Sequence, residues 1–406
     1  MDEKKRYSDI DSLLRGAISA NDDLKSTPFP LNQLFEQRLH TLDITKNQAV
    51  KILDVEVKTL DPILNGEARK IDFLTILKLS DFLEIPHNEI IKNYFQVVSD
   101  AHNDNLSKSK VRSFIVNNFN LPSLKKIGFI ESINDFEHIE QKLLSFFGYN
   151  DIFEYAKYKV SPAFSSSKRN SNRDNLTFWV ASAYESFKMT PNNNAYNRQA
   201  LVDYFPTIRW HSMNVENGLW LVAQALFKFG VTLVYIPKFT TDLHVRGATF
   251  SYDDKPCIAL TKYTEYYPTI WFALIHELYH VLFDFDKIRE DKYHISGEME
   301  TMNINEEEAN KFAREYLFSD EKMAAVRPHL NNPGFVKVFA EQNHVHPSFI
   351  YVFNAFDSTG GQNKYAKLKP HLPNFSGLLE NFNAKNWEEF PPIKQISKIR
   401  TSKLSK

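Results

Sequence analysis

One segment in the middle of the chain constrains the fold more than any other. Residues 273–283 read ALIHELYHVLF, an apolar run interrupted only by His276, Glu277, Tyr279 and His280. A run of this kind predicts a buried helix, and buried helices exclude histidine and glutamate unless a partner satisfies them. We therefore expect a core helix that carries a polar site.

The two histidines of this helix are spaced for binding a metal ion. His276 and His280 are four residues apart, which places both imidazoles on one face of a helix, one turn apart. Two such rings can bind one zinc ion at about 2.0–2.1 Å each. Glu277 follows the first histidine and is placed to accept a proton from a zinc-bound water molecule.

A catalytic zinc ion needs a third protein ligand, for which the sequence offers several candidates. The segment NEEEANKFAREYLF, 305–318, predicts a helix capped by Asn305, and Glu306 and Asn310 share one face of it. With Glu306 on the metal, the Asn310 carbonyl can accept the distal ring N–H of a ligand histidine. Ala309 and Ala313 on that side would let the two helices approach closely. Glu307, Glu308, Glu298, Glu300 and His294 remain alternative ligands.

Two further interpretations of the histidine pair stay open at this point. In one, the histidines pair with Glu306 in the core and no metal binds. In the other, a zinc site persists without hydrolytic activity. Tyr279 is expected to have a structural role, with oxyanion assistance as the alternative. His294 is expected in a surface loop, with a position facing substrate as the alternative.

The region around the motif predicts a mainly helical fold with a small sheet, of the α+β class. VTLVYIP, 231–237, predicts a strand, and ATFSYDDKPCIALT, 248–261, predicts a hairpin. Residues 257–261 are interpreted as an edge strand beside the zinc that could hold an extended peptide, or as an ordinary buried strand.

Composition limits the compartment and the class of protein. The net charge is -1, Cys257 is the single cysteine, and no uninterrupted apolar stretch approaches the length of a membrane span. We expect no disulfide framework, no signal peptide and no membrane association, and therefore a cytoplasmic protein.

At this point the chain resembles a known family. VTLVYIP, the Gly247 strand start, HELYH and the E-x-x-A-N-x-F-A helix at 306–313 resemble the ImmA/IrrE metallopeptidases over residues 176–320. The resemblance implies a gluzincin-like fold with zinc bound by His276, His280 and Glu306. It implies Glu277 as the general base.

The N-terminal part resembles a second family. Residues 35–85 resemble a Cro/C1-type (XRE) helix-turn-helix, with Thr45 as the N-cap of its second helix and Asn65-Gly66 ending its third. Double-stranded DNA is the implied partner, contacted by Lys46, Lys58 and Thr59. Residues 1–100 carry more acidic than basic residues, which is atypical of a DNA-binding domain. A fold retained for dimerisation or for docking a partner repressor is the alternative.

The expected organisation follows from these resemblances and from composition. We predict a polar leader (1–30), a helix-turn-helix domain (31–96), a helical connector (97–164), a linker (165–175), an ImmA/IrrE-like metallopeptidase domain (176–330) and a C-terminal helical extension and tail (331–406).

The predicted function is that of a cytoplasmic zinc endopeptidase that is coupled to a helix-turn-helix domain and controls transcription. The resemblance implies a regulatory protein as substrate, such as a repressor or an antitoxin, whose cleavage would relieve repression. The alternative is a DNA-binding regulator or antitoxin-like protein with a non-hydrolytic metal site. In a third hypothesis DNA binding and proteolysis are coupled, so that bound DNA restrains the protease. A homodimer is a further expectation.

Overall fold

The computed structural model describes residues 30–68, 72–92, 94, 103–158, 171–239, 243, 245–296, 306–358, 368–382 and 386–404. The chain divides into two compact units, 1–110 and 111–406. The predicted polar leader, apart from Pro30, lies outside the described residues. Among the described residues, no helix combines the length and apolarity needed to cross a membrane.

The first unit is built of short helices around its own apolar core. Its helices are α2 (Leu31–Leu42), α3 (Lys46–Leu53), α4 (Val57–Leu64) and α5 (Phe73–Leu83). Thr45 caps α3 in a capping box with Gln48, and α4 ends at Asn65 before Gly66, whose φ is 73°. These boundaries confirm the predicted start of the second helix and end of the third.

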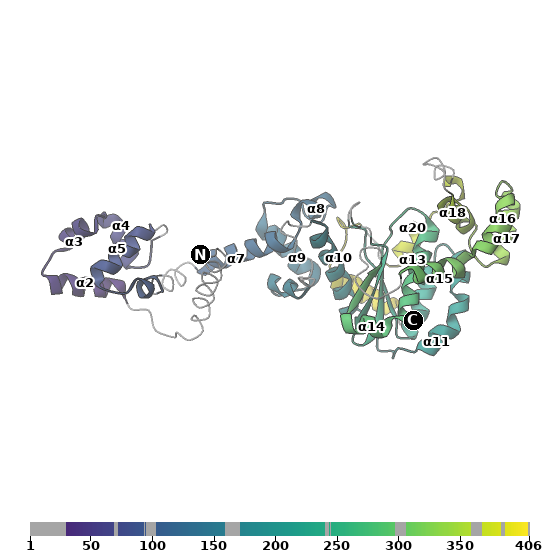
Figure 1. Cartoon of the computed structure of the whole chain (residues 1–406), viewed down its shortest axis with the longest axis horizontal. Helices are drawn as coiled ribbons and strands as arrows, with labels where there is room; N and C mark the ends of the chain where they lie inside the picture. The colour runs from purple at the N-terminus through teal and green to yellow at the C-terminus, as the bar shows by residue number, and fades with distance from the viewer. Residues whose placement is uncertain are drawn as a thin grey trace, which may run out of the picture. The chain divides into compact units, whose positions relative to one another are not determined.

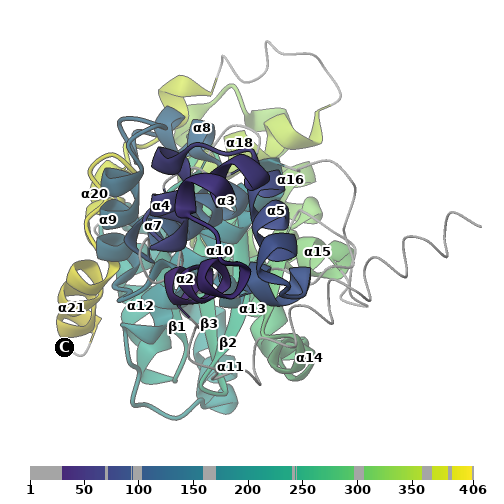
Figure 2. The same cartoon turned by 90° about the vertical axis from the view of Figure 1, so that its left-hand side faces the viewer.

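A four-stranded mixed sheet organises the described part of the second unit. Its strands are β1 (Thr232–Tyr235), β2 (Gly247–Tyr252), β3 (Lys255–Leu260) and β4 (Tyr293–Ser296), in the order β1-β3-β2-β4. Figure 2 shows β1, β3 and β2 side by side in this order. The helices and the small sheet confirm the α+β class.

The hairpin forms where the sequence predicts it. β2 and β3 pair antiparallel and are joined by Asp253 and Asp254, whose φ angles are 53° and 55°. Left-handed residues at both turn positions match the twist of a two-residue hairpin. The interpretation of 257–261 as an edge strand is wrong, because β1 pairs in parallel with the other side of β3. Sequence alternation cannot reveal that long-range pairing.

Side-chain alternation along the strands divides the unit into two cores. Leu233 and Ile258 pack in one core, whereas Val234 and Cys257 pack in the other, because successive strand residues point to opposite faces. Figure 1 shows α13 (Tyr267–Phe283) and α10 (Ser171–Lys188) on opposite sides of the sheet. The unit is therefore a sheet with helices on both faces.

The remaining described elements follow in chain order, and the first of them crosses the boundary between the units. They are α7 (Asn103–Asn118), α8 (Leu121–Lys126), α9 (Phe136–Phe147), η1 (Ile152–Tyr158), α11 (Arg198–Tyr204), η3 (Phe205–Met213), α12 (Gly218–Lys228), α14 (Phe285–Asp291), α15 (Glu306–Phe318), α16 (Asp320–Val326), η4 (Arg327–His329), α17 (Pro333–Gln342), α18 (Ser348–Asp357), η5 (Lys369–His371), α20 (Ser376–Glu380) and α21 (Ile393–Leu404).

The second unit joins segments that the sequence suggests are separate. Helix α10 begins at Ser171, so 171–175 of the predicted linker belong to a helix, and its part 165–170 lies outside the described residues. Side chains of α9, α10 and α21 share one core with the sheet. The described parts of the connector from residue 111 on and of the C-terminal extension therefore pack with the region that carries the motif.

Candidate metal centre

Helix α13 places three ionisable side chains in the interior of the second unit. His276, Glu277 and His280 are 4%, 0% and 0% exposed. The two histidines lie on one helix face, with their Nε2 atoms 3.1 Å apart. The spacing in the sequence predicts this arrangement, because four residues are close to one helical turn.

Glu306 on α15 closes the group. Its Oε2 lies 3.3 Å from His276 Nε2, and its Oε1 lies 3.3 Å from His280 Nε2. Ala309 and Ala313 are fully buried, which allows α15 to approach α13 closely. One ligand atom from each of the three residues lies within 4.8 Å of the others, so the group can hold a metal ion.

The other glutamates considered as ligands do not belong to this described group. Glu307 is exposed, and the Glu308 carboxylate accepts a hydrogen bond at 2.9 Å from Tyr279. Both are rotated away from Glu306 by the helical period. Glu298, Glu300 and the predicted cap Asn305 lie outside the described residues.

Tyr279 links the two helices of the site. Its hydroxyl donates to Glu308, and its ring lies 5.4 Å from the Phe312 ring, also on α15. Burial, together with the Glu308 carboxylate, raises the pKa of Tyr279 to about 12. These contacts connect α13 to α15, and the structural role expected for Tyr279 stays a prediction.

His294 lies in a different place from the one expected. It belongs to strand β4, is 6% exposed, and its Nε2 lies 2.6 Å from Glu306 Oε1. The expected surface loop is wrong, because Thr249 of β2 pairs with His294 and brings this segment into the sheet. His294 therefore contacts the carboxylate that completes the metal-binding group.

Asp284 is a site residue that our sequence analysis missed. Its Oδ2 lies 2.9 Å from His280 Nδ1, the contact that fixes the ring of a ligand histidine. The sequence predicts such a contact for Asn310. Within the described residues, however, no hydrogen bond joins Asn310 to either histidine, and Asn310 lines a neighbouring pocket. The same four-residue spacing that relates the histidines also relates His280 to Asp284, so the signal was present in the sequence.

The surroundings of Glu277 fix one carboxylate oxygen and leave the other unbonded. Thr249 Oγ1 donates to Glu277 Oε2 at 2.7 Å. Within the described residues, the buried Oε1 has no hydrogen-bond partner. Gly247 lies against this carboxylate, and a Cβ on Gly247 would lie 2.7 Å from Oε1. The resemblance singled out Gly247, whereas nothing in the sequence pointed to Thr249.

The carboxylates and imidazoles of the group shift one another's pKa values. Burial opposes protonation of His280, but hydrogen bonds to Glu306 and Asp284 and the charge of Glu277 outweigh it, so the pKa of His280 is raised. Burial likewise opposes ionisation of Glu306, but hydrogen bonds from His276, His280 and His294 hold its pKa well below the usual range. In the metal-free protein these contacts therefore favour the protonated form of His280 and the ionised form of Glu306.

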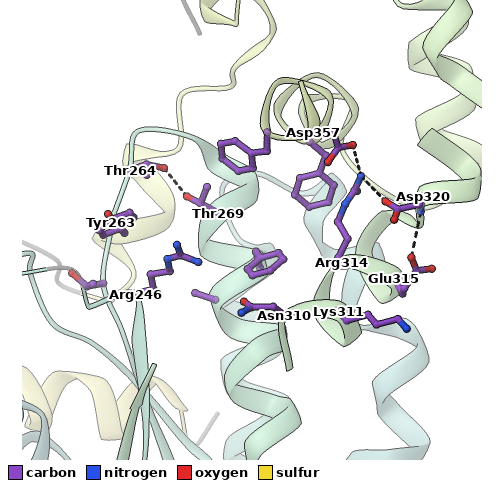
Figure 3. Close-up of a pocket in the computed structure, with 15 residues that line it drawn as sticks. Arg246, Tyr263, Thr264, Thr269, Asn310, Lys311, Arg314, Glu315, Asp320 and Asp357 are labelled. Atoms are coloured by element: carbon purple, nitrogen blue, oxygen red, sulfur yellow. Dashed lines mark hydrogen bonds and ion pairs between the residues drawn. The ribbon is translucent and has the colours of Figure 1, made fainter. Parts of the chain in front are cut away.

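A pocket of about 710 Å³ adjoins the group. It is lined by Arg246, Thr261, Tyr263, Thr264, Thr269, Phe272, Ala273, Asn310, Lys311, Arg314, Glu315, Asp320, Phe353, Phe356 and Asp357 (Figure 3). Ala273 lies one turn before His276 on α13, and Asn310 lies one turn after Glu306 on α15. The pocket thus begins where the metal-binding faces of both helices end.

The predicted DNA-contacting residues of the first unit lie beside acidic side chains. Lys46 pairs with Asp61 at 2.5 Å, and Lys58 pairs with Glu56 at 2.7 Å. Thr59 is exposed on α4. These ion pairs place carboxylates among the side chains that would contact phosphate.

The comparisons with known proteins add no relative. No family model, no curated protein and no solved structure matches the chain.

Proposed function

We propose that this chain is a zinc-dependent endopeptidase. The observation that supports the proposal is the group formed by His276, His280 and Glu306, with Glu277 buried beside it and one of its carboxylate oxygens unbonded. An apolar core accepts such a set of ionisable groups only where something compensates for its burial.

The donor atoms fit a catalytic zinc ion. Two imidazole nitrogens and one carboxylate oxygen are the ligand set of zinc peptidases, which keep a further coordination position open. Asp284 supports His280 and His294 supports Glu306 by hydrogen bonds, as the outer contacts of zinc ligands do. A bound zinc ion would polarise the scissile carbonyl and lower the pKa of a coordinated water molecule toward about 7.

The protein's own groups would then move the proton. The free Oε1 of Glu277 accepts a proton from the attacking water molecule and returns it to the leaving amine. Thr249 holds the other oxygen and thereby fixes the direction in which the free oxygen points. Burial of Glu277 keeps bulk water from competing for that oxygen.

The proposed biological setting rests on the resemblance. The ImmA/IrrE metallopeptidases and the helix-turn-helix domain imply a cytoplasmic protein that cleaves a regulatory protein, such as a repressor or an antitoxin. The first unit has a hydrophobic core of its own, which supports the proposal that it is a separate recognition domain.

The substitution Glu277→Gln tests the proposal. Glutamine retains size and hydrogen bonding but cannot accept the proton, so we expect normal zinc content and loss of cleavage by at least two orders of magnitude. Cleavage of fluorescein-labelled casein and of a proteome-derived peptide mixture is measured by fluorescence and mass spectrometry. Glu307→Gln, an exposed neighbour, is the matched control and should cleave as the wild type does. A zinc-loaded Glu277→Gln protein with wild-type activity would contradict the proposal.

A second candidate function, docking of a partner protein by the first unit, is favoured by the surface of that unit. Ile52, Phe73 and Leu74 are 63%, 59% and 55% exposed, and Lys46 and Lys58 are engaged with acids. Gel-shift assays on the gene's upstream DNA at low salt distinguish the two partners. Sequence-specific, salt-sensitive retardation that Lys58→Gln weakens would favour DNA; its absence would favour a protein partner.

A further inference from the structure

The pocket beside the metal-binding group has an apolar floor. Phe272, Ala273 and Phe353 line it, and the last two are 4% and 2% exposed. The ring centroids of Phe272 and His276 are 6.5 Å apart. The floor therefore begins next to the first histidine of the group.

The charges at one end of the pocket are already satisfied. Arg314 donates to Asp357 at 2.8 Å, pairs with Asp320 at 3.2 Å, and lies over the Phe353 ring. Its guanidinium lies at the α18 side of the pocket, between the carboxylates of Asp320 and Asp357 (Figure 3). Arg314 is therefore already paired and is not free to bind a carboxylate of a ligand.

Arg246 differs from Arg314. It directly precedes Gly247, against which Glu277 packs, and Figure 3 shows its side chain extending from the start of β2 into the pocket. Its guanidinium carbon lies 5.6 Å from the centre of the Tyr263 ring. Within the described residues no carboxylate pairs with Arg246. Lys311 is a further lysine or arginine cation in the pocket lining and comes from α15, on the other side of the pocket from β2. Among the described residues, Arg246 at the metal-facing end of the pocket is thus a cation without a paired carboxylate.

The position of the pocket matches the spacing of an extended peptide. Ala273 precedes His276 by three residues, a rise of about 4.5 Å along the helix, and successive residues of an extended chain are about 3.3–3.6 Å apart. A peptide with its scissile carbonyl at the metal-binding group would therefore place a neighbouring side chain over this floor. A volume of about 710 Å³ accommodates an aromatic or branched side chain.

We propose that this pocket binds a large apolar side chain next to the scissile bond and that Arg246 binds a carboxylate of the same peptide. The carboxylate belongs either to an acidic side chain or to the C-terminus of the substrate. Guanidinium groups pair with carboxylates in a planar, bidentate manner, which adds specificity to charge attraction. This inference rests on the proposed peptidase function and extends it to the class of substrate.

Binding of defined peptides tests the inference without requiring cleavage. The probes are Ac-Gly-Gly-Phe-Asp-NH2, its Phe→Ala and Asp→Asn counterparts, and Ac-Gly-Gly-Phe with a free C-terminal carboxylate. Each is titrated into zinc-loaded Glu277→Gln protein and into metal-free wild type, and affinity is measured by calorimetry or ligand-observed NMR. We expect about tenfold weaker binding when Phe becomes Ala, and when the carboxylate becomes an amide.

Variants assign each contribution to a residue. Arg246→Gln should abolish the preference for Asp over Asn, and Ala273→Leu should weaken the Phe peptide about tenfold. Lys337→Gln, an exposed cation on α17, and Ala325→Leu, on the exposed face of α16, are the matched controls. Arg246→Gln should weaken either the peptide with the internal Asp or the peptide with the free C-terminus. The peptide that is weakened identifies the source of the carboxylate.

The outcomes separate this inference from the proposed function. Equal affinity for the Phe and Ala peptides, equal affinity for the Asp and Asn peptides, or no binding of any peptide would overturn the inference. Arg246-dependent binding by a wild-type protein that cleaves nothing would support the pocket and contradict the peptidase. Cleavage without any preference for large apolar residues would support the peptidase and contradict the pocket.

Cys257, 3% exposed in β3, reports folding, since its alkylation rate should stay low in every correctly folded variant.

Discussion

The carboxylate of Glu277 packs directly against the Cα of Gly247, so that a Cβ at this position would lie 2.7 Å from Oε1. No side chain other than hydrogen fits at position 247 unless Glu277 moves. The start of β2 thus packs closely against the centre of α13 at the Glu277 carboxylate, which we propose as the general base.

Gly247→Ala should therefore impair cleavage without removing the metal. The added methyl group displaces Glu277 and strains its hydrogen bond from Thr249, while the histidines are untouched. We expect at least a tenfold loss of kcat at unchanged zinc content, measured by peptide cleavage and metal analysis. Gly334→Ala is the control, because its Cβ would meet only Asn332 Oδ1 at 3.4 Å. A Gly247→Ala protein as active as the control would show that the position of Glu277 does not matter.

His294→Ala should weaken metal binding. His294 holds Glu306 Oε1 at 2.6 Å, and loss of such a contact typically lowers metal affinity about 10–100-fold. Zinc affinity is measured by competition with a chelating dye. Excess zinc should restore cleavage, and His294→Gln, which retains a hydrogen-bond donor, should bind zinc more tightly than His294→Ala. Unchanged zinc affinity in His294→Ala would refute this role.

Zinc binding should displace the proton of His280. The pKa of His280 is raised above its ordinary value of 6.5, since its hydrogen bonds to Glu306 and Asp284 outweigh burial. A raised pKa keeps the ring protonated to higher pH, so that zinc must displace a proton and zinc affinity falls as pH falls. Calorimetry in buffers of different ionisation enthalpy counts the protons released. Asp284→Asn removes one cause of the raised pKa and should release fewer protons at pH 7; equal release by both proteins would be inconsistent with this explanation.

Glu185→Ala should destabilise the second unit. Glu185 is fully buried in α10 and accepts hydrogen bonds from Tyr149 and Tyr158 while pairing with Lys157 at 2.8 Å. Its removal leaves the hydroxyls of Tyr149 and Tyr158 without their acceptor, and each buried polar group left unsatisfied costs about 1–3 kcal/mol, which urea denaturation should detect. Glu131→Ala, an exposed glutamate, should change the free energy of unfolding by less than about 0.5 kcal/mol.

The same residue predicts a pH dependence of stability. Burial raises the pKa of Glu185, but the hydrogen bonds and charges of its partners outweigh burial and lower it below the ordinary value of 4.5. A lowered pKa stabilises the folded state above pH 4.5, and this contribution is lost as pH falls. Glu185→Gln should therefore lose less stability between pH 5 and pH 3 than the wild type; a steeper loss would contradict the assignment.

Local patterns allowed the main features of the fold and site to be predicted. His276 and His280 share a face because helical spacing fixes their relation within one element, and Asp253-Asp254 mark the hairpin through turn chemistry. Glu306 was selected from several acids by its place on the next helix and by the resemblance. Each of these predictions depends on residues close together in the sequence or on one helix packing against another.

The errors concern relationships between distant segments. The central position of β3 depends on β1, more than twenty residues earlier, and the burial of His294 depends on its pairing with Thr249. The pocket gathers residues from 246 to 357, which no local pattern relates. Asp284 is different, since its four-residue spacing from His280 is a local pattern that places it one helical turn from the ring.

Metal analysis of the purified protein tests the central claim most directly. After equilibration with zinc and desalting, we predict one zinc ion per chain in the wild type and in Glu277→Gln, and less than about a tenth of that in His280→Ala and Glu306→Ala, with Cys257 unreactive throughout. Zinc retained at one ion per chain in both His280→Ala and Glu306→Ala would contradict the proposed metal centre.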